Sequence, residues 1–212
     1  MLKIWGRTTS SNVQKVMWTV AELGLAHERI DAGGAFGLVN EDWYRAMNPN
    51  GLVPTVEDDG QIIWESNAIV RYLAGRYGTG TISPADPIAR AQAERWMDWQ
   101  ISTVSPDWGA MFMGMVRTPP SKRDHAAVAA AIKRLGDSYM ILDAQLAGRD
   151  YIMGDTLTIA DIPLGVSMYR YYELDVEHAP LPNVEAWYAR LTARPAYAKH
   201  VMVSFESLMV KD

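Results

Sequence analysis

Four hydroxyl side chains stand in a row near the start of the chain, in the stretch GRTTSSNVQKV. Thr8, Thr9, Ser10 and Ser11 follow a short apolar run and precede a helical pattern that begins at Val13. One hydroxyl is enough to cap the first turn of a helix, so the others are either solvated or available to a ligand. A hydroxyl at a helix N-terminus can stabilise an anion. The cluster therefore indicates a candidate anion site.

Thiol chemistry in this protein would need a sulfur from another molecule, because the 212 residues include no cysteine. That absence excludes disulfides, thiolate metal ligands and a cysteine nucleophile. The four histidines show no metal-ligand spacing, so we expect no metal site. They are His27, His125, His178 and His200.

Charge and hydropathy exclude two classes of partner. The net charge of -5 and the absence of a Lys or Arg run argue against nucleic-acid binding. No apolar stretch is long enough to cross a bilayer, and the first residues lack a signal-peptide pattern, so we expect no membrane partner. We therefore expect a cytoplasmic protein.

The first part of the chain alternates between strand and helix patterns. LKIW, HERID, TVED and QIIW read as strands, and Asp59-Gly60 predicts a hairpin between the last two. Helical spacing runs from Val13 to Gly24, EDWYRAM predicts a short helix, and SNAIVRYLAGRYG predicts a helix with Ser66 near its N-cap. This order predicts a small mixed α/β sheet that carries helices, in a domain of residues 1–78.

The second part reads as an all-α helix bundle. Small residues and prolines at 79–87 predict a linker, and residues 88–212 follow helical patterns that TPPSKRD and Arg194-Pro195 interrupt. One apolar stripe steps by three and four residues, through Val128, Ile132, Leu135, Tyr139, Leu142 and Leu146. Thr158 and Asp161 in TIAD form a capping-box variant, which favours a structural role for Asp161.

Residues Asn48 to Gly78 combine an NPxGxVP turn, a hairpin and a Glu-Ser pair at a helix start. This combination resembles the cytosolic glutathione transferase family, and the resemblance covers essentially the whole chain. It implies a thioredoxin-like N-terminal domain followed by an all-helical domain, and a homodimer. SSNVQKV is most similar to bacterial members that place a hydroxyl or amide, rather than cysteine or tyrosine, beside the glutathione sulfur.

The resemblance implies a glutathione site in three parts. In the family the residue before a cis proline pairs with the cysteinyl backbone of glutathione, and here these two residues are Val53 and Pro54. Alternatively, Pro54 only begins a strand. One sequence does not distinguish a cis from a trans bond. Glu65 and Ser66 would hold the γ-glutamyl ammonium and carboxylate, or serve only the helix start. The family's usual anchors for the glycine carboxylate are missing. The polar residues left nearby are Asn40 and Asn50, which could also serve turns.

A free thiol has a pKa of about 8.5, so the site must favour the thiolate. Lowering that pKa by two units takes about 2.7 kcal/mol. A hydrogen bond to a charged group supplies about 1.5 to 3 kcal/mol and a helix N-terminus about 0.3 to 1. One hydroxyl at the helix start therefore suffices. By resemblance we assign this role to Ser10 first, then Asn12, then Ser11.

We expect the electrophile between the two domains, against WGAMFMGMVRTPP. Trp108, Met111, Met115 and Arg117 are the pocket residues this predicts, although methionine at helical spacing also suits a plain core. Arg7 and Arg117 raise the option of an anionic electrophile such as a haloacid.

The predicted function is a glutathione transferase that uses glutathione as co-substrate. Two alternatives stay open: a glutathione-dependent disulfide or peroxide reductase using two glutathiones, and a non-catalytic binding module of the same fold. The tail SFESLMVKD either is disordered or closes the pocket.

Overall fold

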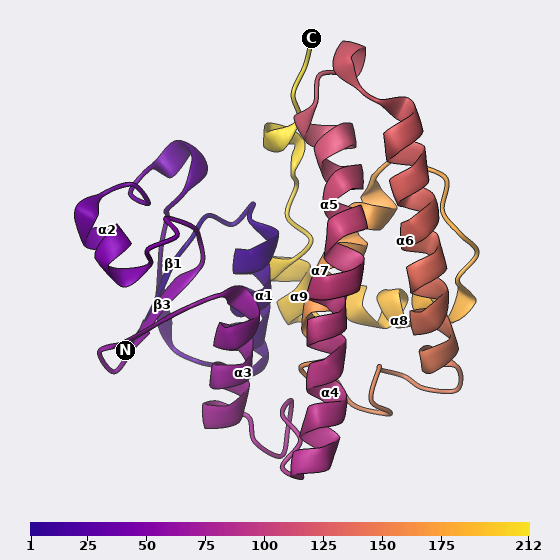
Figure 1. Cartoon of the computed structure of the whole chain (residues 1–212). Helices are drawn as coiled ribbons and strands as arrows, with labels where there is room; N and C mark the ends of the chain where they lie inside the picture. Colours follow the sequence, from indigo (N-terminus) through magenta and orange to yellow (C-terminus); the bar gives the residue numbers. More distant parts are fainter.

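A four-stranded mixed sheet forms the centre of the first part of the chain (Figure 1). The computed structural model describes all residues from 1 to 212. The strand order is β2-β1-β3-β4, with β1 parallel to β2 and antiparallel to β3, and β3 antiparallel to β4. The strands are β1 Leu2–Trp5, β2 His27–Ile30, β3 Thr55–Asp58 and β4 Gln61–Trp64. The predicted mixed sheet and its order of elements are confirmed.

Three α-helices and one 3-10 turn accompany this sheet. They are α1 Ser11–Glu22, η1 Gly34–Phe36, α2 Asp42–Met47 and α3 Ser66–Tyr77. Apolar residues of α1 and α3 pack on those of the sheet, including Val16, Leu73 and Ile4, in one buried cluster. The hairpin between β3 and β4 turns at Asp59 and Gly60, whose φ angles of 49° and 76° suit a tight turn.

The second part is helical throughout. Its helices are α4 Pro87–Trp99, α5 Ser105–Phe112, α6 His125–Leu146, α7 Asp161–Glu173, α8 Pro182–Thr192 and α9 Pro195–His200. Two π-helical segments, η2 Gln100–Val104 and η3 Met113–Arg117, extend α4 and α5, and two short 3-10 turns are η4 Pro120–Lys122 and η5 Glu206–Leu208. The apolar stripe predicted on α6 faces the core. No helix is both long and apolar enough to cross a membrane.

The π-helical segment η2 has a local cause in the sequence. Pro106 lacks an N–H group, and in an α-helix its ring would clash with the carbonyl of Ser102. The wider π turn precedes Pro106 and carries the chain past it without ending the helix. As a result α4, η2 and α5 form one long rod beside the first part of the chain (Figure 1).

Helix α7 lies at the centre of the helical part and is buried along most of its length. The Asp161 carboxylate accepts hydrogen bonds from the Thr158 N–H, the Ile152 N–H and Trp187 Nε1, at 2.8, 3.0 and 3.0 Å. The predicted structural role of Asp161 agrees with this geometry. A capping box would have the Thr158 hydroxyl accept the N–H of Asp161, but here it accepts the N–H of Ala160 at 3.3 Å.

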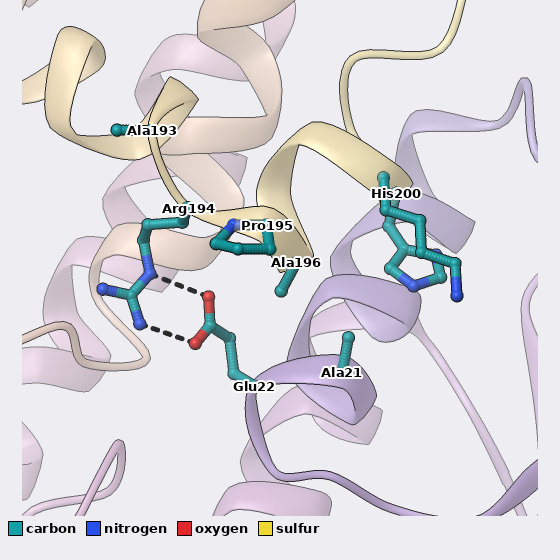
Figure 2. A pocket seen from close by; sticks show the side chains of 8 residues that line it. Ala21, Glu22, Ala193, Arg194, Pro195, Ala196 and His200 are labelled. Atoms are coloured by element: carbon teal, nitrogen blue, oxygen red, sulfur yellow. Dashed lines mark hydrogen bonds and ion pairs between the residues drawn. The ribbon is translucent and has the colours of Figure 1, made fainter.

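Helix α1 joins the two parts, since it packs on α3 on one side and on α7 and α9 on the other. Trp18 of α1 lies edge-on to Tyr197 of α9, with ring centroids 4.8 Å apart. A side chain at Gly165 of α7 would meet the Trp18 ring at 2.9 Å, so glycine permits this close approach. At the end of α1, Arg194 donates to both carboxylate oxygens of Glu22 at 2.8 and 2.6 Å (Figure 2).

The C-terminal tail is docked on the end of η3. The Phe205 side chain is buried in the helical core, and the Val210 N–H donates to the Val116 carbonyl at 2.9 Å. The Asp212 carboxylate accepts from Ser121. The sequence left open whether the tail is disordered or closes the pocket, and the structure places it against the helices.

Candidate functional site

Three turns leave the sheet at the same edge. Trp5, the last residue of β1, pairs with Thr55, and Thr55 pairs with Trp64. The hydroxyl-rich turn follows Trp5, Val53–Pro54 precedes Thr55, and Glu65–Ser66 follows Trp64. The strand register therefore brings together the three segments that the sequence singled out separately.

Ser10 is the N-cap of α1, yet its hydroxyl makes no capping hydrogen bond. Its backbone is extended, with φ -88° and ψ 120°, and its carbonyl accepts the Gln14 N–H at 2.9 Å. The Ser10 N–H donates to the Arg7 carbonyl at 3.2 Å. The side-chain hydroxyl thus stays free beside the N-terminus of a helix, where an anion is stabilised.

Ser11 and Asn12 lie on a different face of the same turn. Both line a cavity of about 210 Å³ between the two parts of the chain, together with Trp108 and Lys15. The Asn12 amide oxygen accepts the Ser66 hydroxyl at 3.2 Å, which links α1 to the start of α3. The structure therefore brings Asn12 and Ser66 together and separates their contacts from the unengaged Ser10 hydroxyl.

Lys15 is a charged residue at the site that the sequence reasoning missed. Its side chain is 5% exposed, and its Nζ lies 3.5 Å from Ser66 Oγ and 3.3 Å from Gln100 Oε1. Burial lowers the pKa of Lys15 to about 8, while the negative charge of Glu65 acts in the opposite direction. No carboxylate forms an ion pair with it. Lys15 is buried because α1 is packed on both sides, which its sequence pattern alone does not reveal.

Glu65 and Ser66 begin α3 in an unusual conformation. Glu65 is the N-cap and has a φ of 71°, in the left-handed region that disfavours side chains other than glycine. Its side chain is exposed, whereas Ser66 is buried. Strained backbone of this kind is concentrated at functional sites. The pair therefore presents an exposed carboxylate and a helix N-terminus at the same edge of the sheet.

The Val53–Pro54 bond is cis, which the sequence could not decide. The Val53 N–H and carbonyl take part in no backbone hydrogen bond of the chain. Val53 packs against Gly33, where a Cβ would lie 3.2 Å from Val53 Cγ1 and 3.1 Å from Arg7 Nη1. Val53 thus has free backbone groups that an extended peptide can pair with.

Asn40 and Asn50 are both exposed and both serve local turns. Arg45 Nη2 donates to Asn40 Oδ1 at 3.0 Å, and the Asn50 N–H donates to Asn48 Oδ1 at 3.1 Å. The Arg45 guanidinium also lies against Gly51, where a Cβ would meet its Nη2 at 3.2 Å. Arg45 is therefore a further cation beside Gly51, two residues before Val53 in the chain, and the sequence reasoning did not consider it.

The four residues predicted for the electrophile pocket do not lie together. Trp108 lines the interdomain cavity and donates from Nε1 to the Ser167 carbonyl at 3.0 Å. Met111 is completely buried in the helical core and does not line this cavity, contrary to the expectation from the sequence. Met115 lines a separate groove beside α6, and Arg117 is half-buried without an ion-pair partner.

A separate surface hollow of about 550 Å³ lies elsewhere. It is lined by Glu22, Arg194, His200 and their neighbours at the C-terminal end of α1 (Figure 2). Ser10 precedes the other end of this helix, about 16 Å away at 1.5 Å per residue. The site residues converge at the N-terminal end of α1 and not at this hollow.

Family models and curated proteins match the chain over most of its length. Residues 9–76 match the family model "Glutathione S-transferase, N-terminal domain", and residues 107–195 match "Glutathione S-transferase, C-terminal domain". The chain is 44% identical over 205 residues to glutathione S-transferase GstB of Escherichia coli, covering 96% of this chain and 99% of that protein. It is 30% identical to glutathione S-transferase 3 of Zea mays, covering 94% and 93%.

Solved structures give the same result. The theta class glutathione S-transferase of Xanthomonas axonopodis pv. citri, crystallised with glutathione bound, matches with a TM-score of 0.91 and 47% identity. The match covers 96% of this chain and 98% of that one. The glutathione S-transferase of Pseudomonas fluorescens matches with a TM-score of 0.82 and 28% identity, over 96% and 99% of the two chains.

Proposed function

Because the chain belongs to the glutathione S-transferase family and acts as a glutathione transferase, we propose how its residues hold and activate glutathione. The observation that carries the proposal is the free Ser10 hydroxyl at the start of α1. It lies at the sheet edge shared by the cis Val53–Pro54 bond and by Glu65.

Ser10 is the residue we assign to the sulfur. Its hydroxyl donates a hydrogen bond to the thiolate, and the N-terminus of α1 adds a favourable dipole. Ser11 and Asn12 are the weaker candidates, since Ser11 already belongs to α1 rather than capping it and the Asn12 amide oxygen is engaged with Ser66. Together the hydroxyl and the helix end provide about 2 to 4 kcal/mol of preference for the anion.

The γ-glutamyl end is placed at the start of α3. Ser66 and the N-terminal amides of α3 receive its α-carboxylate, and the exposed Glu65 carboxylate faces its ammonium group. Lys15, with its Nζ 3.5 Å from Ser66 Oγ, adds a positive charge behind the carboxylate. This assignment gives the buried lysine the negative partner that it lacks in the chain itself.

The rest of glutathione is placed along the 51–54 segment. Val53 pairs through its free N–H and carbonyl with the cysteinyl unit, as an added strand pairs with a sheet edge. Arg45 receives the glycine carboxylate, and Asn40 orients the guanidinium through the 3.0 Å hydrogen bond. Asn50, which bonds to Asn48, has the weaker case for this role.

The reaction we propose is attack of the glutathione thiolate on an electrophilic carbon. The electrophile binds between the two parts of the chain, near Trp108, and Arg117 lies further along the same rod of helices. A carbon–sulfur bond forms as the leaving group departs with its bonding electrons, or as a double bond accepts the thiolate. We further propose a cytoplasmic, homodimeric enzyme that serves detoxification, as the resemblance implies. Exposed apolar side chains such as Leu52, Ile101 and Met113 are available for a dimer interface.

Calorimetric titration with glutathione tests the proposal, with the thiolate followed in parallel by difference absorbance across pH. We expect binding with a lowered thiol pKa, and we expect Ser10→Ala to raise that pKa by about one to two units. Thr8→Ala removes an exposed hydroxyl from the same turn and serves as the matched control. Binding without a pKa shift would favour disulfide chemistry or a binding module. A shift lost in Ser11→Ala but kept in Ser10→Ala would contradict the assignment of Ser10.

A further inference from the structure

Three arginines gather around the Ser10 turn without any carboxylate to neutralise them. Arg7 begins the turn, since its carbonyl accepts the Ser10 N–H. Arg170 of α7 donates from Nη2 to the carbonyl of Thr9 at 2.6 Å. Neither these two nor Arg117 belongs to an ion pair of the structure. Positive charge therefore surrounds the turn that holds the proposed sulfur donor.

Arg170 is the most constrained member of this arginine cluster. It is 3% exposed, and its guanidinium lies over the rings of Phe112 and Phe205 at 4.8 and 5.5 Å. Its buried Nε has no hydrogen-bond partner. A buried charge normally needs an opposite charge and full hydrogen bonding, so Arg170 lacks both a counter-ion and one acceptor.

Arg117 follows Phe112, on which the Arg170 guanidinium packs, along the same continuous helix of α5 and η3. It ends the π-helical segment η3, in which residues five apart lie on successive turns, and Phe112 is five residues before it. The three charges act on one another. Burial and the charges of Arg117 and Arg7 lower the pKa of Arg170 to about 10, and burial and Arg117 lower the pKa of Arg7.

We propose that the electrophile bound by this enzyme carries a carboxylate next to its reactive carbon, and that Arg7, Arg117 and Arg170 hold this carboxylate beside the glutathione sulfur. This inference rests on the proposed function and specifies the substrate class of the same site. The half-buried ring of Trp108, which lines the interdomain cavity and stacks on Phe112 at 5.2 Å, provides an apolar surface for the remainder of a small substrate.

The chemistry explains why cations are useful here. The thiolate attacks the carbon that bears a halide, the carbon–sulfur bond forms, and the halide leaves with the electrons of the broken bond. The thiol proton has already passed to solvent. A negative carboxylate on the neighbouring carbon repels the incoming thiolate, and guanidinium groups cancel that repulsion while they orient the carboxylate through paired N–H donors.

Iodoacetate and iodoacetamide make a matched pair for the test, since they share leaving group and carbon and differ in charge. The absence of cysteine removes the alkylation of protein thiols by these reagents. We compare kcat/KM for each, divided by its uncatalysed rate with glutathione. We expect the acid to be preferred, and Arg117→Gln to lower the acid-to-amide ratio by about 10- to 100-fold with an unchanged KM for glutathione.

The exposed Arg95 on α4 supplies the control, because Arg95→Gln removes the same charge from another face and should leave the ratio unchanged. Equal preference for acid and amide in the unmodified enzyme would overturn the proposal while leaving the transferase function intact. An equal loss of affinity for glutathione itself in Arg117→Gln would also overturn it, because the arginines would then hold a carboxylate of glutathione.

A binding measurement separates this inference from the transferase function. Calorimetry compares S-carboxymethylglutathione with S-carbamoylmethylglutathione, the two products, and requires no turnover. We expect tighter binding of the acid, and loss of that preference in Arg117→Gln. If neither reagent is consumed faster than in free solution but the preference is present, the transferase proposal fails and the carboxylate site stands. If binding of the two products is equal, the carboxylate site is refuted.

Discussion

Replacing Lys15 by methionine should make the protein more stable and its glutathione site weaker. Methionine keeps the length and apolar stem of the side chain and removes the charge. In the folded protein the Lys15 Nζ has two uncharged oxygen neighbours, on Ser66 and Gln100, at 3.5 and 3.3 Å. The buried charge is therefore partly solvated by the protein but not neutralised.

The size of the effect follows from the pKa. Burial lowers the pKa of Lys15 from 10.5 to about 8, and 2.5 units at 1.36 kcal/mol each amount to about 3 kcal/mol. The unfolded chain binds this proton up to pH 10.5 and the folded chain only up to about 8, so the free energy of unfolding rises with pH between these values. Below pH 8 the whole penalty is present. Loss of the hydrogen bond to Gln100 costs about 1 kcal/mol, so we expect a net gain of about 2 kcal/mol at pH 7.

Urea unfolding followed by tryptophan fluorescence, from pH 7 to pH 10.5, measures this prediction. The unmodified protein should gain stability across that range from Lys15, and Lys15→Met should lack that part of the rise. Lys133→Met, at an exposed position of α6, is the matched control and should change stability by less than about 0.5 kcal/mol. Identical pH slopes in the unmodified protein and Lys15→Met would refute the reasoning.

The same variant also tests the function of the lysine. Calorimetry should show glutathione bound about 10-fold more weakly, because the α-carboxylate at Ser66 loses a nearby positive charge. A proton is taken up on binding near pH 8, since the carboxylate raises the pKa of Lys15. Calorimetry in buffers of different ionisation enthalpy detects that proton. Unchanged affinity together with no proton uptake would show that Lys15 has no part in glutathione binding.

Two further predictions concern stability away from the site. Asp161→Asn replaces a carboxylate acceptor by an amide whose N–H₂ group faces the donors of Ile152 and Trp187. We expect urea unfolding to show a loss of stability of about 2 to 4 kcal/mol. A loss below about 1 kcal/mol would contradict this hydrogen-bond account. Glu22→Gln weakens the bidentate ion pair with Arg194 between α1 and α9. We expect a loss of stability of about 1 to 3 kcal/mol that becomes smaller in 1 M salt. A loss that does not depend on salt would indicate an effect on packing instead.

Local signals allowed most of the fold to be predicted from the sequence. The hairpin depends on Asp59-Gly60, the breaks between helices depend on prolines, and the apolar stripe of α6 depends on spacing alone. The π-helical segments were not predicted. The cause of η2, Pro106, is visible in the sequence, but whether a proline ends a helix or widens it depends on neighbouring helices that hold the chain in place. The predicted boundaries at 78 and 87 remain a prediction.

The site was harder to predict, because its details depend on packing between distant segments. The cis state of Val53–Pro54 is fixed by tertiary context that one sequence does not contain. Met111 and Trp108 lie three residues apart on α5, and the sequence does not tell which of the two faces the core. Lys15 escaped notice because α1 is packed on both sides, so its polar positions read as a solvent face.

Three energetically unfavourable features of this protein lie near one another. Glu65 adopts a left-handed backbone, Lys15 is buried without a carboxylate, and Arg170 is buried among like charges. All three surround the first turn of α1. Asp161 and Arg194, which lie elsewhere in the chain, have several hydrogen bonds or an opposite charge. Selection for stability alone would remove strain and unpaired charge. Their persistence around a single turn is therefore evidence, independent of any relative, that a negatively charged ligand completes the structure there.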